Sequence, residues 1–294
     1  MAQLPKLYDF LLPICLACLF FCNTIGAAAV PPPASPQPSH HFVLVHGAAH
    51  GAWCWFEIIT LLRSSGQRVT ALDMAASGID PQEANNIRSV ADYFQPLADF
   101  IVALPSTERV ILVGHSYGGI GLTYSMELFP QKIAVAIFVT AVMPGPTLDV
   151  SVVNQAVSMS LQSMLDSTYS YNNGSNNPPT SVLVGPTTLA TKVYQLSPVD
   201  DIVLATLLVR RFPLFTEENL SDVIRPTKER YGRVKRVYIM SGQDQVLKVD
   251  FQEKMIRGNP PDEVLKVNDS DHMVMFSKPT ELSELLLRIA GQYS

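Results

Sequence analysis

Ser116 is the first residue of this sequence whose surroundings indicate chemistry. It is the centre of the Gly-x-Ser-x-Gly pattern at 114–118 and follows the apolar run Val110 to Val113. That run predicts a buried strand, and residues 120–129 have apolar positions at helical spacing. Strand, glycine-flanked serine and helix in this order form a nucleophile elbow, which exposes the serine hydroxyl at a strained turn. The alternative is an ordinary glycine-rich turn that only packs.

The serine needs a base, because a free hydroxyl is a weak nucleophile at neutral pH. Six histidines are present, and only His272 follows Ser116. In α/β-hydrolases the catalytic groups occur in the order Ser, acid, His. His272 ends a polar loop at 268–272, directly after a predicted strand at 263–267. A lone surface histidine is ordinarily only solvated, but this position predicts that His272 is the base.

The acid should follow the preceding strand. Residues 237–240 are such a strand, and they lead into the turn Ser241-Gly242-Gln243-Asp244. We predict that Asp244 orients the imidazole and stabilises the imidazolium without taking its proton. Asp250 and Asp271 are the alternatives. The first is expected on the following helix, and the second adjoins His272 and should point elsewhere.

Acyl transfer also needs donors for an oxyanion. In this arrangement they are backbone N–H groups, one directly after the nucleophile and one in the first loop between a strand and a helix. These would be the amides of Tyr117 and Ala48. Gly47 and Gly51 keep the first loop slim, so that a substrate can approach its main chain.

The rest of the chain must build the frame that positions these groups. Buried-strand patterns alternate with amphipathic helical stretches, which indicates a mostly parallel central sheet with helices on both faces. The strands are expected at 42–46, 67–72, 110–113, 132–139, 233–239 and 263–267, and the helices at 53–64, 89–103, 120–129, 251–257 and 279–290. Residues from about 146 to 231 show helical pieces, a polar loop and no run of paired buried strands. We therefore expect an α/β-hydrolase fold over 41–294, with this stretch inserted as a cap.

Residues 1–40 have the composition of a targeting segment and a linker. Lys6 precedes an apolar run at 10–22, small residues follow at 26–29, and a Pro/Ser-rich linker occupies 31–39. This order predicts a cleavable secretory signal, and hence the secretory pathway or the extracellular space. The alternatives are an uncleaved membrane anchor and a plastid transit peptide. Pro13 weakens a spanning helix, and the segment lacks Arg.

Cysteine content, glycosylation sequons and net charge bear on the kind of protein that this sequence encodes. Three of the four cysteines lie at 15–22, so cleavage would leave Cys54 alone and exclude an internal disulfide. Asn173, Asn219 and Asn268 begin glycosylation sequons. A net charge of -5 and a pI near 5.7 give no electrostatic case for binding nucleic acid.

With these residues in place, the sequence resembles the plant methylesterase and hydroxynitrile lyase family of α/β-hydrolases from about residue 42 to the C-terminus. The motifs that carry the resemblance are FVLVHGAAHGAWCW (42–55), GHSYGG (114–119), YQLSPVDD (194–201), ERYGRVKRVYIMSGQD (229–244) and DHMVMFSKP (271–279). The resemblance implies a triad of Ser116, Asp244 and His272 that hydrolyses small methyl esters, including methylated plant hormones. It implies a small-molecule ester as partner, no metal ion and no organic cofactor. The oligomeric state stays open, a homodimer included.

Two positions separate the branches of this family. The lyases carry Thr in the first loop and Lys directly after the catalytic His, where this chain has Gly47 and Met273. An ammonium group beside the histidine would stabilise departing cyanide, which a methionine cannot do. The esterase is therefore favoured over a hydroxynitrile lyase. A hormone-binding receptor with little turnover is a third class that the same fold can serve.

The cap departs from the best-known esterases of the family, which have a tryptophan lining the acyl pocket. Both tryptophans of this chain, Trp53 and Trp55, lie in the first loop. Four apolar cap residues are candidates to shape the pocket, although ordinary cap core is the favoured interpretation of each: Met159, Met164, Leu165 and Phe215. The identity of a hormone substrate therefore does not carry over.

Overall fold

Runs of apolar residues form six strands that pair, all in parallel, in the order β2-β1-β3-β4-β8-β9. In chain order they are β1 (His41–Val45), β2 (Arg68–Leu72), β3 (Val110–His115), β4 (Ile133–Val139), β8 (Lys235–Ser241) and β9 (Glu263–Val267). The computed structural model describes residues 39–153, 155–156 and 165–293. The described residues from 39 onward form one compact unit. The predicted parallel sheet of an α/β-hydrolase fold is confirmed.

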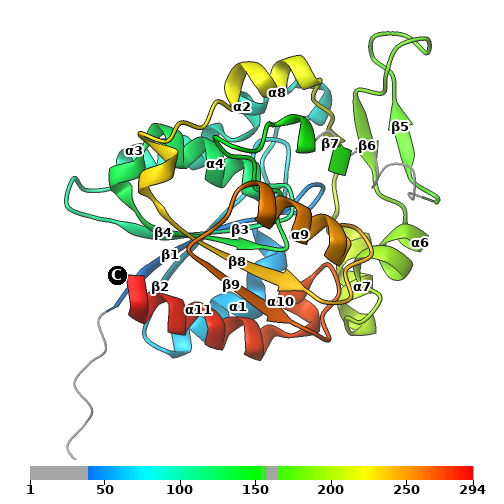
Figure 1. Ribbon diagram of the computed structural model, residues 1–294. Coiled ribbons are helices and arrows are strands. Elements are labelled where there is room, and N and C mark those ends of the chain that lie inside the picture. The colour runs from blue at the N-terminus through cyan, green and yellow to red at the C-terminus, as the bar shows by residue number, and fades with distance from the viewer. Residues whose placement is uncertain (1–38, 154, 157–164, 294) are drawn as a thin grey trace, which may run out of the picture. The chain divides into compact units, whose positions relative to one another are not determined.

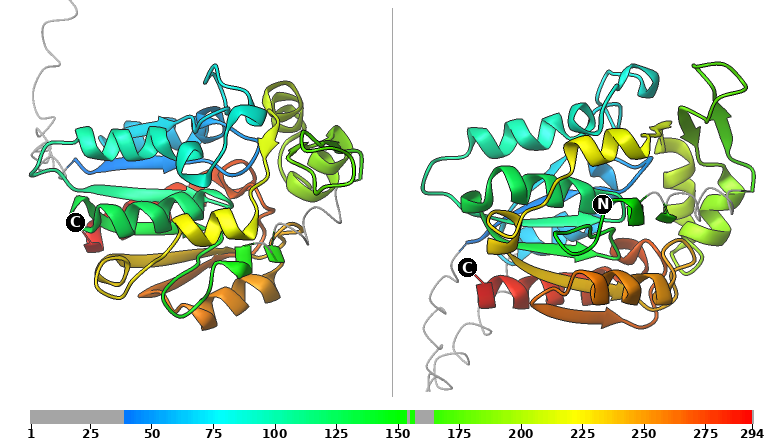
Figure 2. Two further views of the ribbon diagram at one scale, coloured as in Figure 1. Left: turned by 90° about the horizontal axis from the view of Figure 1, so that it is seen from above. Right: turned by 45° about the horizontal axis from the view of Figure 1, so that its top comes forward.

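Helices cover both faces of this sheet, because alternate residues of each strand point to opposite sides. On β3, Val110 and Leu112 pack with one helix layer, whereas Ile111 and Val113 pack with the other. The first layer contains α3 (Gln95–Ala103), α4 (Gly118–Leu128) and α9 (Val249–Gly258); the second contains α1 (Phe56–Ser64) and α11 (Pro279–Tyr293). Figures 1 and 2 show the two layers on either side of the strands. A strand buried on both faces reads as the continuous apolar run found at 110–113.

One predicted helix is in fact two. The stretch at 89–103 divides into α2 (Val90–Tyr93) and α3, with a break at Phe94. Ser89 caps α2, since its side chain accepts a hydrogen bond from the Asp92 amide. Pro96 lies in the first turn of α3, where its missing N–H leaves no helical bond unmade. The apolar periodicity continues through 89–103, so the sequence does not predict this break.

Most of the described chain between β4 and β8 lies beyond the carboxyl ends of the strands, whereas residues 217–233 return alongside α2 and α4 toward the start of β8 (Figure 1). The helical elements of this stretch include α6 (Pro186–Thr188), the π-helix η4 (Leu189–Val193), α7 (Val199–Leu208) and α8 (Glu217–Val223). It also contains a small antiparallel sheet of β5 (Thr168–Ser170), β6 (Ser181–Leu183) and β7 (Phe212–Pro213). The sequence does not predict this small sheet, because strands of two or three residues leave no periodic pattern to read. The polar loop at 171–179 is the hairpin connection between β5 and β6.

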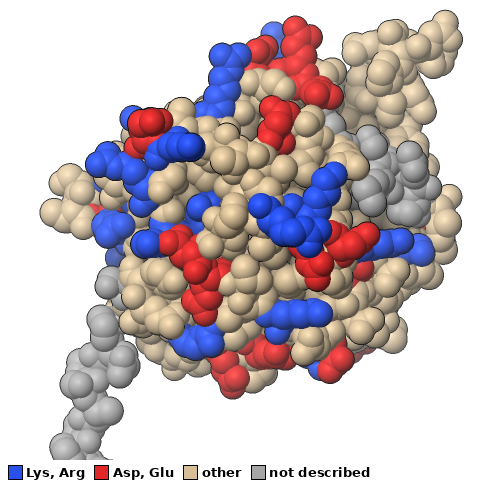
Figure 3. Space-filling model, viewed as in Figure 1, with Lys and Arg blue, Asp and Glu red and all other residues tan. Residues whose placement is uncertain are grey.

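The remaining short elements join the larger ones. They are η1 (Ala52–Trp55), η2 (Ala84–Asn86), η3 (Pro130–Lys132), η5 (Tyr231–Arg233) and α10 (Val274–Ser277). Figure 3 shows cationic and anionic side chains interspersed on one face, without a large area of a single sign. Within 39–153, 155–156 and 165–293, no helix is long and apolar enough to cross a membrane.

Candidate active site

Ser116 lies at the turn between β3 and α4, in a backbone conformation that few residues other than glycine adopt. Its φ is 52°, in the left-handed region. The flanking glycines leave no room for side chains: a Cβ on Gly114 would lie 2.5 Å from Leu122 Cδ1, and one on Gly118 would lie 2.7 Å from the Val45 carbonyl oxygen. The fold therefore presents the serine at a strained, closely packed turn, the geometry of a nucleophile elbow.

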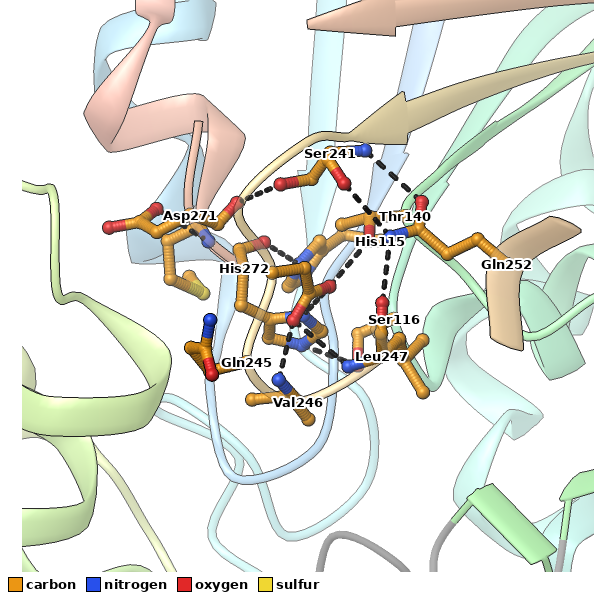
Figure 4. Close-up of polar contacts among 12 residues, drawn as sticks. His115, Ser116, Thr140, Ser241, Gln245, Val246, Leu247, Gln252, Asp271 and His272 are labelled. Carbon is orange, nitrogen blue, oxygen red and sulfur yellow. Dashed lines mark hydrogen bonds and ion pairs between the residues drawn. The ribbon is translucent and has the colours of Figure 1, made fainter. Parts of the chain in front are cut away.

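The structure brings the three predicted residues together, two of which, Ser116 and His272, are labelled in Figure 4. His272 Nε2 lies 3.0 Å from Ser116 Oγ, and His272 Nδ1 lies 2.7 Å from Asp244 Oδ2. The two other carboxylates that we considered are elsewhere. Asp250 is in the first turn of α9, and Asp271 accepts hydrogen bonds from the cap. A serine, an imidazole and a carboxylate in this sequence of contacts can transfer the serine proton to the imidazole.

The Asp244 carboxylate is held by donors that sequence reasoning missed. Thr140 donates its hydroxyl hydrogen to Oδ2 over 2.7 Å, and the amides of Val246 and Leu247 donate to Oδ1 over 2.6 and 2.9 Å. Thr140 is fully buried, with a φ of 38° directly after β4. The one signal for it in the sequence is its position at the end of a strand. These bonds fix the orientation of the carboxylate toward His272.

The loop that carries His272 is fixed at the same edge of the sheet. His115 Nε2 lies 2.8 Å from the His272 carbonyl oxygen and so carries the proton, while burial lowers the pKa of His115 well below its ordinary value. Ser241 donates its hydroxyl to the carbonyl oxygens of Ser270 and Asp271, over 2.8 and 2.7 Å. The loop of the base is therefore supported through its main chain by the ends of two strands, β3 and β8.

The amides of Ala48 and Tyr117 both border the cavity beside Ser116. In the part of the chain that the structure describes, neither N–H donates to another residue. Gly47, directly before Ala48, packs closely against the turn of Ser116. A Cβ at position 47 would lie 2.9 Å from Ser116 Cβ and 3.0 Å from His115 Nδ1. This arrangement leaves two donors available for a developing oxyanion.

A cavity that is partly open to solvent adjoins Ser116 and His272. Its cap-side wall is mainly apolar and contains Val182, Leu189, Val193, Phe212 and Leu214. Apart from the three histidines at 50, 115 and 272, Lys192 is the one described lining residue whose side chain can carry a positive charge. Its ammonium group forms no hydrogen bond or ion pair with any described residue. Such a cavity suits a small, largely apolar molecule.

Two of the four candidates for the pocket wall do not line this cavity. Leu165 is 64% exposed and Phe215 packs on Tyr93 and Phe212, so neither lines the wall. Met159 and Met164 lie outside the described residues. Among the described residues, the cap wall is formed by Ala156 and by residues within 182–193 and 212–214.

Met273 is also placed differently from our expectation of a residue beside the catalytic chemistry. Its side chain is fully buried in the layer that contains α1 and α11, and it is not among the residues that line the cavity. Over the described ranges, no group of three or more His, Cys, Asp or Glu side chains is placed to hold a metal ion.

Comparison with known proteins places this site in a family. The family model described as "Alpha/beta hydrolase family" matches residues 42–285. "Methyl jasmonate esterase 1" of Vitis vinifera is 51% identical over 255 residues, covering 86% of this chain and 98% of that protein. "Methylesterase 10" of Arabidopsis thaliana is 42% identical, covering 88% and 94%. The crystal structure of tomato Methylketone Synthase I with 2-tridecanone superposes with a TM-score of 0.85 at 47% identity, covering 88% of this chain and 100% of that one. The chain therefore belongs to the α/β-hydrolase family, among the plant methylesterases.

Proposed function

We propose that this protein is a serine carboxylesterase that hydrolyses methyl esters of small acids, with Ser116, His272 and Asp244 as its catalytic triad. The observation that carries the proposal is the chain of contacts from Ser116 Oγ through His272 to Asp244, at the floor of a cavity. The names of the relatives support the ester class, since one is a methyl jasmonate esterase and another a methylesterase.

The reaction follows from the geometry. Ser116 Oγ attacks the ester carbonyl carbon while His272 Nε2 takes its proton. The amides of Ala48 and Tyr117 hold the oxyanion of the tetrahedral intermediate, which collapses as His272 returns the proton to the departing methanol. A water molecule then attacks the acyl-enzyme with His272 again as base, and the free acid leaves.

The cavity suggests which acids fit. Its apolar cap wall favours a hydrocarbon acyl group, whereas the ammonium group of Lys192 favours a hydrogen-bond acceptor on that group. We therefore infer that the preferred substrates are methyl esters whose acid carries a keto, hydroxyl or carboxylate group away from the ester. Methylated plant hormones and related metabolites are the proposed source of such esters.

The test is a hydrolysis screen with purified protein. Methyl esters of aromatic, indole and cyclopentanone acids and p-nitrophenyl acetate are the substrates, and mandelonitrile is the control for lyase activity. We expect acid release from at least one methyl ester and no cyanide release above background. Efficient cyanide release would overturn the esterase in favour of a lyase, and turnover of none of these would favour a receptor-like binding protein.

We further propose that residues 1 to about 30 are a cleaved secretory signal, from the order of Lys6, the apolar run at 10–22 and the small residues at 26–29. Expression in plant cells followed by N-terminal sequencing should give a mature end near Ala29. An intact Met1 on membranes would support an anchor instead, and plastid import would support a transit peptide. Size-exclusion chromatography of the same sample distinguishes a monomer from a homodimer.

A further inference from the structure

The cap segment Tyr194–Ser197, between η4 and α7, is connected to three loops of the proposed active site, those that carry Ala48, Asp244 and His272. It is part of the motif YQLSPVDD at 194–201, to which the proposed reaction assigns no role. We propose that this segment, called here the clasp, is a positioning element that sets the oxyanion donor and the base of the triad relative to each other. The inference rests on the proposed esterase function.

Tyr194 connects the clasp to the oxyanion loop. Its side chain is fully buried, and its hydroxyl lies 2.7 Å from His50 Nε2. On the other side of the ring, His50 Nδ1 lies 2.8 Å from the carbonyl oxygen of Ala48. The two rings also stack, with centroids 5.8 Å apart at 25°. One rigid side chain therefore joins the clasp to the residue that supplies an oxyanion donor.

The direction of these hydrogen bonds follows from the groups themselves. A carbonyl oxygen can only accept, so Nδ1 of His50 carries the hydrogen and Nε2 is left as an acceptor. Burial lowers the pKa of His50 to about 4, which keeps the ring neutral at neutral pH. Burial also raises the pKa of the Tyr194 hydroxyl, which therefore remains a donor. Loss of that hydroxyl leaves a buried acceptor unpaired and frees the ring that holds Ala48.

The next residues of the clasp reach the two loops of the acid and the base. Gln195 donates from Nε2 to the carbonyl oxygen of Gln243, directly before Asp244, over 2.6 Å. The amide of Leu196 and the hydroxyl of Ser197 donate to Asp271 Oδ2 over 2.9 and 2.8 Å.

Asp271 passes this contact on to the base. The other oxygen of its fully buried carboxylate accepts from the Met273 amide over 3.0 Å, so Asp271 ties the clasp to both sides of His272. Figure 4 shows the carboxylate of Asp271 pointing away from the ring of His272, as this role requires.

The clasp thus acts on the chemistry without touching a reacting atom. A displacement of a donor or base by a fraction of an ångström lowers the rate of the chemical step but leaves ground-state binding nearly unchanged. The effect should be moderate, because the oxyanion loop is also held by the Arg210 amide, which donates to the Ala49 carbonyl oxygen over 2.9 Å.

The test compares Tyr194→Phe and Ser197→Ala with the wild-type chain, and Tyr171→Phe is the matched control. Tyr171 is an exposed tyrosine of the same cap, in the hairpin between β5 and β6. For Tyr194→Phe we expect a fall in kcat of about tenfold with KM within about twofold, for Ser197→Ala a fall of about threefold, and for the control no change. Hydrogen–deuterium exchange should accelerate at 47–53 in the first variant and at 268–273 in the second.

The outcomes separate the clasp from the esterase proposal. A rise in KM at constant kcat would assign Tyr194 to substrate binding and overturn the clasp. Unchanged kcat together with unchanged exchange in both loops would also overturn it. If Tyr194→Phe does not fold, Ser197→Ala alone decides. If the wild-type protein hydrolyses no ester, the proposed function fails, and the exchange measurements still decide whether the clasp holds these loops.

Discussion

The sheet domain and the cap differ in their secondary structure and in what they contribute to the site. The sheet domain places its chemistry at the ends of six parallel strands, four of which are buried over most or all of their length. The cap has strands of two or three residues, and its hairpin at 167–185 contains no charged residue. The reacting groups themselves therefore come from the sheet domain. Within the cap, the clasp helps to position those groups, whereas the cap wall shapes the acyl pocket. A change in the sheet domain should alter kcat for every ester, whereas a change in the cap wall should alter KM for some esters.

The largest effect should come from the nucleophile itself. Ser116→Ala removes the attacking oxygen and keeps the Cβ, so we expect kcat to fall by on the order of 10⁴-fold or more for all esters. His272→Ala should cost about as much, because triad members act as a unit. Thermal unfolding should be unchanged, and Ser106→Ala, at an exposed serine, is the control. Near-normal turnover by Ser116→Ala would show that another residue is the nucleophile.

A smaller loss should follow from releasing the acid. Thr140→Val keeps the β-branched shape but removes the hydrogen bond to Asp244. A hydrogen bond to a charged group is worth about 1.5–3 kcal/mol, so kcat should fall by about ten- to a hundredfold, equally for all esters. Thr140→Ser, which retains the hydroxyl, should restore most of the activity. If valine and serine behave alike in steady-state kinetics, the hydroxyl does not orient the carboxylate.

The cap wall should respond in a substrate-dependent way. Lys192→Met keeps the length and the apolar stem but removes the ammonium group. For a methyl ester whose acid carries a keto group, KM should rise about tenfold, and for the matched ester without that group it should stay within about twofold. Lys228→Met, at an exposed lysine outside the cavity, is the control. Equal effects on both esters would contradict a role of Lys192 in selecting acceptor groups.

The smallest effect concerns the stability of the protein in acid. It involves His50, which connects the sheet domain to Tyr194 of the cap. Burial lowers the pKa of His50 to about 4, and that of His46 and His115 also falls. The unfolded chain then binds protons first, near pH 6.5, so the free energy of unfolding should decrease as the pH falls from about 6.5 toward 4.

His50→Gln tests this contribution. In this variant, the decrease in the free energy of unfolding between pH 7 and pH 5.5 should be smaller by about 1 kcal/mol, as measured by urea unfolding. The control is His40→Gln, which also replaces a histidine by glutamine but lies outside the cavity. An unchanged slope in His50→Gln would show that His50 is protonated alike in the folded and unfolded chains.

The sequence predicts which three side chains meet at the site, because strong local rules apply there. The glycines around Ser116 are required by steric contact at the elbow, and only one histidine follows it in the chain. The four largely buried strands are also predictable from the sequence, because burial on both faces requires a continuous apolar run.

What the sequence does not reveal depends on contacts between distant segments. Thr140 and Asp244 are 104 residues apart, and His50 and Tyr194 are 144 apart. Neither pair leaves a periodic signal, and the cap strands are too short to leave one. The cavity wall could not be predicted either, because the residues that line it depend on how the cap segments are laid over the strand ends.

The tight space around Gly47 constrains the order in which this chain could acquire a new activity. A Cβ at that position would collide with Ser116 Cβ, so a threonine there requires the elbow to move first. A lysine at 273 would meet a second obstacle, since it would replace a fully buried methionine in the core. Each change alone should be harmful in this background and tolerated only after neighbouring substitutions. Such sign epistasis makes the passage from esterase to lyase depend on mutational history, and a library built on this chain should vary the contacts of both positions at the same time.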